Sequence, residues 1–170
     1  VSMGVALPLF IESDCELIDV ELFNEISIEE FSKELSKFLP EGCKILSVNK
    51  IEKSTPAIDH TLQWAEYRVS LVKKDDCNLK SFMYNCDMVL SRDEILLTKK
   101  NKKGLLKTSN IKSSIKSYTF KDDNLYLILK TGQGSEIPAV RADDIMKLIS
   151  DNTIFDIKRL RFFDENDVEL

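Results

Sequence analysis

The sequence predicts an α+β fold, and two patterns together with the chain length support this. Segments that alternate apolar and polar residues, typical of strands with one solvent-facing side, occur between segments whose apolar residues recur at helical spacing. The later segments follow the order β-α-β-β-α-β, the split βαβ or ferredoxin-like pattern. With 170 residues, the chain suits one domain, or two small subdomains that share a core. We therefore expect two ferredoxin-like halves.

The first predicted half covers residues 1–64. Ser27 is placed to cap a helix, and Glu30 stands at the capping-box position. Phe31, Leu35 and Phe38 then form one apolar stripe, which predicts that they are core residues. The expected elements are strands at 1–9, 16–22 and 44–51, a turn at Glu12-Ser13-Asp14, and a helix from Ser27 to Leu39 that stops at Pro40 and Gly42.

This first half lacks the opening strand and helix of the split βαβ pattern. The pattern would be complete if a strand and a helix preceded Val1. Because the first residue is not methionine, we expect that an upstream part of the protein is absent from this sequence.

The second predicted half covers residues 65–170 and is expected to be the complete ferredoxin-like unit. Its first helix carries Met83 and Cys86 on the apolar stripe, so both are predicted to be core residues. The expected elements are a connection or short helix at 54–64, strands at 66–72 and 94–100, a helix at 77–90, a basic connection, a hairpin of 114–120 with 125–131, a loop at 132–135, a helix at 142–150 and a strand at 155–163.

Composition and cysteine spacing exclude several classes of function. No apolar run approaches the ~20 residues of a membrane span, and residues 1–10 contain no basic residue and include Pro8, unlike a secretory signal. Cys15, Cys43, Cys77 and Cys86 form no C-x-x-C pair, and His60 is the single histidine. We therefore expect a cytoplasmic protein with reduced thiols and with no metal, iron–sulfur cluster or other cofactor in this chain.

Three patterns resemble catalytic or ligand-binding sites only weakly. Asp19 and Glu21, within an acidic cluster that begins at Glu12, could act as paired carboxylates or bind Mg²⁺, but a solvated strand face is the favoured interpretation. Asp59 beside His60 could orient a base, but a loop histidine is favoured. The loop at 132–135 lacks the third glycine of a dinucleotide fingerprint and the lysine of a P-loop, so a plain loop is favoured over a phosphate cradle.

The basic stretch is the clearest anomaly. No acidic residue occurs between Ile95 and Phe120, where seven lysines give +7, so the rest of the chain carries −12 against a net charge of −5. Such asymmetry favours a localised anionic partner such as RNA, although a sheet edge protected by lysines would show the same pattern. The candidate anion-binding residues are Lys99, Lys100, Lys102, Lys103, Lys107, Lys112 and Arg141, with Lys116 at the end of the same stretch.

Short segments spread over nearly the whole chain resemble the radical SAM-linked domain, a bacterial family of unknown function. The matching segments are Ala6-Leu7-Pro8-Leu9, Glu12-Ser13, Glu16, Asp19-Val20-Glu21-Leu22, Leu39-Pro40-Glu41-Gly42 and Ala65-Glu66-Tyr67-Arg68-Val69, with weaker matches at Ile111-Lys112-Ser113-Ser114-Ile115 and 134–143. The chain departs from that family at Phe10-Ile11, where the family tends to have glycine, and at Ile111-Lys112-Ser113 and Arg141-Ala142-Asp143, where the family has proline.

This resemblance implies an accessory domain that works with a radical SAM enzyme, by holding an RNA or protein substrate. It implies no established reaction, and no complete catalytic constellation is visible in the sequence. Two alternatives stay open: an enzyme acting on nucleic acid whose catalytic residues lie upstream of Val1, and a pure protein-interaction adaptor.

Overall fold

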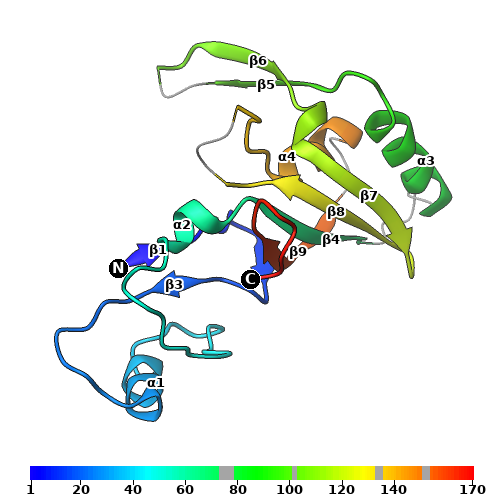
Figure 1. Cartoon of the computed structure of the whole chain (residues 1–170). Helices are drawn as coiled ribbons and strands as arrows, with labels where there is room; N and C mark the ends of the chain where they lie inside the picture. The colour runs from blue at the N-terminus through cyan, green and yellow to red at the C-terminus, as the bar shows by residue number, and fades with distance from the viewer. Residues whose placement is uncertain (73–78, 101–102, 133–135, 151–153) are drawn as a thin grey trace.

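The computed structural model describes residues 1–72, 79–100, 103–132, 136–150 and 154–170, and it has a mixed α+β fold (Figure 1). The strands of the described residues are β1 (Ser2–Met3), β2 (Ile11–Ser13), β3 (Ile18–Asp19), β4 (Trp64–Leu71), β5 (Leu96–Lys100), β6 (Leu106–Asn110), β7 (Ile115–Lys121), β8 (Asn124–Lys130) and β9 (Phe155–Phe163). The helices are α1 (Ile28–Ser36), α2 (Ile58–Thr61), α3 (Leu79–Leu90) and α4 (Ala142–Ile149), with a 3₁₀ turn at Lys112–Ser114.

A five-stranded mixed sheet with the order β2-β9-β4-β8-β7 forms the centre of the molecule. Strands β9, β4, β8 and β7 pair antiparallel, whereas β2 joins the edge of β9 in parallel. The element order β4-α3-β7-β8-α4-β9 follows the predicted β-α-β-β-α-β pattern, with a two-stranded ribbon of β5 and β6 inserted after α3. The predicted α+β class is confirmed, and the division into two ferredoxin-like halves stays a prediction.

The core lies between one face of this sheet and helices α3 and α4. Strand β4 buries alternate residues, and the side chains between them remain half-buried, so its two faces differ as the alternating sequence predicts. Cys86 is fully buried, which confirms its predicted place, and Met83 beside it is half-buried. The core residues of the two helices and three central strands are Phe82, Cys86, Leu90, Ile145, Met146, Ala65, Tyr67, Val69, Leu125, Leu127, Leu129, Ile157 and Phe162.

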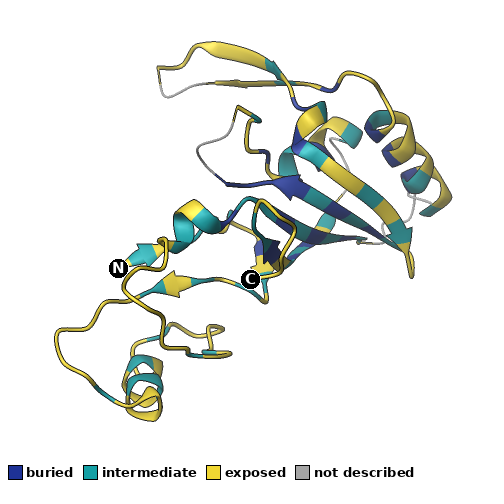
Figure 2. Ribbon diagram, in the orientation of Figure 1, coloured by how far each residue is buried: buried dark blue, intermediate teal, exposed yellow. Residues whose placement is uncertain are grey.

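Helix α1 begins as predicted, but its predicted contribution to the core is wrong. The Ser27 hydroxyl accepts a hydrogen bond from the Glu30 backbone N–H at 3.0 Å, as an N-cap should. However, no residue of α1 is buried: Phe31 and Leu35 are half-buried and Phe38 is 81% exposed. The helix lies away from the central sheet, among mostly exposed residues (Figure 2). An apolar stripe shows which side a helix can bury, but it does not supply the surface that covers it.

Several predicted boundaries in the first half also differ. The strands expected at 1–9 and 16–22 are reduced to the two-residue strands β1 and β3, and residues 44–51 form no strand. The expected turn at Glu12-Ser13-Asp14 instead belongs largely to β2, because Ile11 is buried against β9 and draws the segment into the sheet. The basic connection after β5 contains strand β6, and the predicted helix start at residue 77 lies outside the described residues. No described helix has the length and apolar character needed to cross a membrane.

Candidate nucleic-acid interface

Strands β5 and β6 form a basic ribbon that lies apart from the central sheet (Figure 1). Lys99 stands directly opposite Lys107 in the antiparallel register, and nearby the hydroxyls of Thr98 and Thr108 share a hydrogen bond of 2.8 Å. All four side chains are exposed. Like charges directly opposite each other destabilise a strand pair, so this ribbon carries an electrostatic cost that an anionic partner would relieve.

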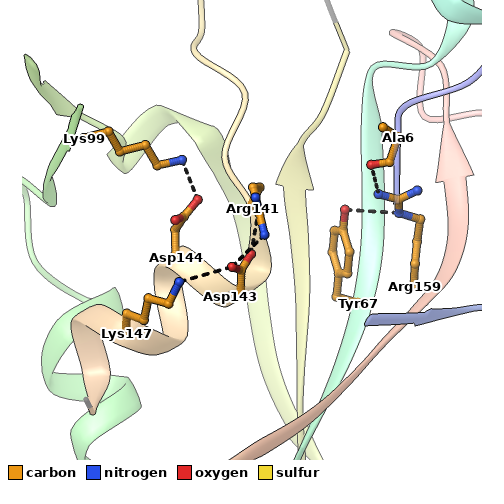
Figure 3. Close-up of polar contacts among 8 residues, drawn as sticks. All are labelled: Ala6, Tyr67, Lys99, Arg141, Asp143, Asp144, Lys147 and Arg159. Carbon is orange, nitrogen blue, oxygen red and sulfur yellow. Dashed lines mark hydrogen bonds and ion pairs between the residues drawn. The ribbon is translucent and has the colours of Figure 1, made fainter. Parts of the chain in front are cut away.

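An ion pair joins this face of the ribbon to helix α4. Lys99 Nζ lies 2.5 Å from a carboxylate oxygen of Asp144 (Figure 3). The pair neutralises Lys99, but no ion pair joins Lys107 or Lys100 to another residue in the described part of the chain. Lys107 and Lys100 are therefore exposed to solvent. They lie on opposite faces of the ribbon, because Lys107 is paired with Lys99 and successive residues of a strand, such as Lys99 and Lys100, point to opposite faces.

Lys112 and Arg141, two of the other predicted anion-binding residues, are held away from the strands of the ribbon. Lys112 donates a hydrogen bond of 2.8 Å from Nζ to the carbonyl of Leu90, the last residue of α3, where a cation stabilises the helix dipole. Arg141 donates hydrogen bonds of 2.8 Å to both carboxylate oxygens of Asp143 (Figure 3). This hydrogen bonding raises the pKa of Arg141 above its ordinary value. Both cations are thus held by the protein itself. Lys103 is exposed, and Lys102 lies outside the described residues.

The acidic cluster is dispersed, so it forms no carboxylate pair. Four of its acids contact basic or backbone donors elsewhere in the chain, as the favoured interpretation of a surface strand predicts. Their partners are Lys158 for Asp14 at 2.8 Å, Arg159 for Glu16 at 2.7 Å, the backbone N–H of Ile58 for Asp19 at 2.9 Å, and Lys53 for Glu21 at 3.5 Å. These contacts connect the first part of the chain to other segments. No two carboxylates of the cluster are left facing each other as an acid/base pair or a Mg²⁺ site would require.

The other two weak candidates have structural surroundings. His60 is exposed at the end of α2, and the Asp59 carboxylate accepts a hydrogen bond from Ser2 Oγ at 3.2 Å. Gly132 is buried so tightly that an added Cβ would meet the Leu62 carbonyl oxygen at 2.0 Å. Gly132 therefore serves close packing of two backbones, and residues 133–135 of the predicted loop lie outside the described residues.

The most elaborate polar site was missed by the sequence analysis. Arg159 is 1% exposed on the core face of β9, where it pairs with Glu16 and donates from Nε to the Tyr67 hydroxyl at 3.2 Å. Its other donors reach the backbone carbonyl of Val5 at 3.0 Å and that of Ala6 at 3.4 Å, and the contacts with Ala6 and Tyr67 are drawn in Figure 3. Arg159 thus fastens the N-terminal segment onto the sheet. Its partners come from the segment at Val5-Ala6, from Glu16 and from Tyr67 of β4, so we assign Arg159 an anchoring role.

The described cysteines are free of disulfides and differ in exposure. Burial raises the pKa of Cys86 to about 12 and that of Cys15 to about 11, whereas Cys43 is exposed. Among the described residues, no three histidine, cysteine or carboxylate side chains surround a point that could hold a metal ion. The expectation that this chain carries no metal stays a prediction.

The fold and this surface define a small α+β protein that presents a basic β-ribbon beside a mixed sheet. The family described as "uncharacterized protein conserved in bacteria (DUF2344)" matches residues 1–140, and the chain belongs to that family. No curated protein and no solved structure matches the chain.

Proposed function

We propose that this chain is an accessory protein that holds an RNA substrate for a partner enzyme, and that the β5–β6 ribbon contacts the RNA. The observation that carries the proposal is the cross-strand pair of Lys99 and Lys107 next to the middle of the ribbon. Two lysines stand opposite each other there, and Asp144 neutralises one of them. Phosphate groups of a nucleic acid would relieve the remaining repulsion.

Lysine chemistry sets the character of the expected binding. Ammonium groups are point charges, so they hold phosphates without reading base edges. Binding is therefore expected to be weak in sequence preference and steep in salt dependence.

The identity of the partner enzyme rests on the sequence resemblance. The segments at Ala6-Leu7-Pro8-Leu9, Glu12-Ser13 and Glu16 resemble the radical SAM-linked domain, so we propose a radical SAM enzyme as the partner. We further propose that residues 65–170 act as the ferredoxin-like unit that carries the ribbon, and that the protein works in the cytoplasm.

Fluorescence-anisotropy titrations of a labelled single-stranded RNA at several salt concentrations test the RNA contact. The variant Lys100→Gln/Lys107→Gln removes the two ribbon lysines that have no ion pair with a described residue. We expect the slope of log K against log salt to fall by roughly 0.7 for each lost phosphate contact.

A matched variant, Lys50→Gln/Lys53→Gln, makes the same change of charge on exposed lysines outside the ribbon. It should bind RNA as the unmodified chain does. If the ribbon variant and the unmodified chain bind alike, or if neither binds at low salt, the ribbon is a protected sheet edge and the RNA proposal fails.

A further inference from the structure

A second basic site lies on the opposite face of the central sheet from α3 and α4, at the end where β4 begins and β8 ends. It consists of Trp64, Lys116 and Lys130, and is called the Trp64 site below. The two lysine Nζ atoms lie 4.9 Å and 5.1 Å from the centroid of the Trp64 ring. Two cations thus converge on one aromatic side chain, an arrangement in which each ammonium is attracted by the ring but repelled by the other.

Backbone irregularity places one of these lysines in the site. The pairing of β7 with β8 shifts register between Ile115 and Ser117, so Lys116 is the extra residue of a β-bulge. A bulge redirects a side chain, and bulges are frequent beside functional sites. If β7 and β8 kept one register throughout, Lys116 would stand opposite a residue of β8, and its side chain would follow the regular alternation of the strand.

The second lysine is buried and forms no ion pair with any carboxylate in the described part of the chain. Lys130 is 4% exposed, and its Nζ donates a hydrogen bond of 2.6 Å to the side-chain oxygen of Gln63. No ion pair joins Lys130 to another described residue. Burial, with a contribution from Lys116, lowers the pKa of Lys130 below its ordinary value. The nearby Glu165 carboxylate favours the charged form of Lys130, but it forms no ion pair with Lys130. A buried ammonium without an ion pair is costly, so the Trp64 site has a deficit of paired negative charge among the described residues.

The chain covers this deficit in part with its own acidic turn. Asp167 forms an ion pair with Lys116, and its backbone has a φ of +66°, a region that L-residues other than asparagine and aspartate seldom adopt. The Asp164 carboxylate holds the turn by accepting hydrogen bonds from the backbone N–H groups of Asn166 at 2.8 Å and Val168 at 2.9 Å. The turn thus presents the Asp167 carboxylate, from a constrained backbone, as the ion-pair partner of Lys116, whereas Glu165 acts on Lys130 without an ion pair.

We propose that the Trp64 site binds a phosphate group and that Asp167 occupies it as an internal competitor. A phosphate carries up to two negative charges and several acceptor oxygens, so it can accept from both ammonium groups, whereas the Asp167 carboxylate pairs with Lys116 alone. The phosphate can belong to a free ion or to a nucleic acid. The site is separate from the β5–β6 ribbon, and it stands or falls independently of the proposed RNA contact there.

Trp64 is the single tryptophan of the chain, so its fluorescence reports on this site. The experiment is a titration of the full chain with inorganic phosphate, at an ionic strength kept constant with chloride. The variant Asp167→Asn removes the competing charge and keeps a residue that tolerates a positive φ. Because exposed ion pairs are weak, we expect phosphate to bind Asp167→Asn about two- to fivefold more tightly than it binds the unmodified chain. Lys116→Gln should lose the response.

Asp123→Asn is the matched control, since Asp123 also has a positive φ of 63° but lies in the turn at the other end of β7 and β8. It should respond as the unmodified chain does, and Lys100→Gln/Lys107→Gln should also keep the phosphate response. A parallel titration with an oligoribonucleotide identifies the source of the phosphate. If the oligoribonucleotide changes Trp64 fluorescence at a far lower concentration of phosphate groups than inorganic phosphate does, the ligand is a nucleic acid. If inorganic phosphate alone changes the fluorescence, the ligand is a free ion. Equal responses of Asp167→Asn and Asp123→Asn, or a response that chloride reproduces, would overturn the proposal.

Discussion

The contact between Arg159 and Glu16 gives the sharpest test of how the N-terminal segment is held. Replacing Glu16 with glutamine leaves the shape of the side chain but removes the counter-ion of a guanidinium that is 1% exposed. Arg159 keeps its hydrogen bonds to the Tyr67 hydroxyl and to the carbonyls of Val5 and Ala6. The loss is therefore confined to the charge of the pair.

The expected magnitude follows from the different burial of the two partners. Breaking a fully buried pair by removing one partner costs about 3–5 kcal/mol. The Glu16 side chain is 42% exposed, so solvent screens the pair, and we expect about 1.5–3 kcal/mol for Glu16→Gln. Arg159→Met also removes the hydrogen bonds to Tyr67, Val5 and Ala6, so its cost should approach the buried-pair range, about 3–5 kcal/mol.

Urea unfolding followed by tryptophan fluorescence measures these free energies. Glu12→Gln is the neighbouring control, because Glu12 is exposed on β2, and it should change stability by less than about 0.5 kcal/mol. The double variant Glu16→Gln/Arg159→Met should cost less than the sum of the single variants, since both remove the same ion pair. A loss for Glu16→Gln no larger than that of the Glu12 control, or strict additivity, would refute the anchoring role of Arg159.

Further predictions concern the core, the reactivity of the thiols and the pH dependence of stability. Phe82 is 3% exposed, and its ring packs against those of Phe120 and Phe155. Phe82→Ala should therefore lower the free energy of unfolding by about 3–5 kcal/mol, whereas Phe38→Ala should lower it by less than about 0.5 kcal/mol. Equal losses in urea melts would contradict the described core. At pH 8, iodoacetamide should modify Cys43 well before Cys86, as peptide mass mapping would show. Because burial raises the pKa of Cys86 from 9.0 to about 12, the unfolded thiol ionises first, so stability should decline as the pH rises from about 9 towards 12, and a Cys86→Ala variant should lose that part of the decline.

The sequence predicted the second half of the fold well because its signals are local and strong. Strand β4 alternates buried and half-buried residues, and α3 places Phe82, Cys86 and Leu90 on one side. In the first half the signals are weak, and the short strand β2 exists because β9 pairs with it in parallel. No local pattern at residues 11–13 reports on a partner so distant in sequence.

The candidate sites show the same limit. The lysine run was visible as a composition anomaly, but the sequence could not show that Lys99 meets Asp144 or that Lys112 meets the end of α3. Arg159 left one readable signal, since it follows Phe155 and Ile157 at alternate positions and so falls on the apolar face of its strand. The approach of Lys116 and Lys130 to Trp64 depends on a bulge, which alternation alone does not predict.

The parallel pairing of β2 with β9 also bears on the order in which the molecule is assembled. Ile11 has its sheet partner in Ile157, so the edge strand β2 has no partner in this sheet until β9, which lies far later in the sequence, has emerged from the ribosome. Such long-range closure slows folding and leaves the early segment exposed in the meantime. Strand β9 inserts between β2 and β4, and its Arg159 brings the donors that fasten Val5 and Ala6. Residues 11–13 therefore join the central sheet only after the segment that contains β9 has been made.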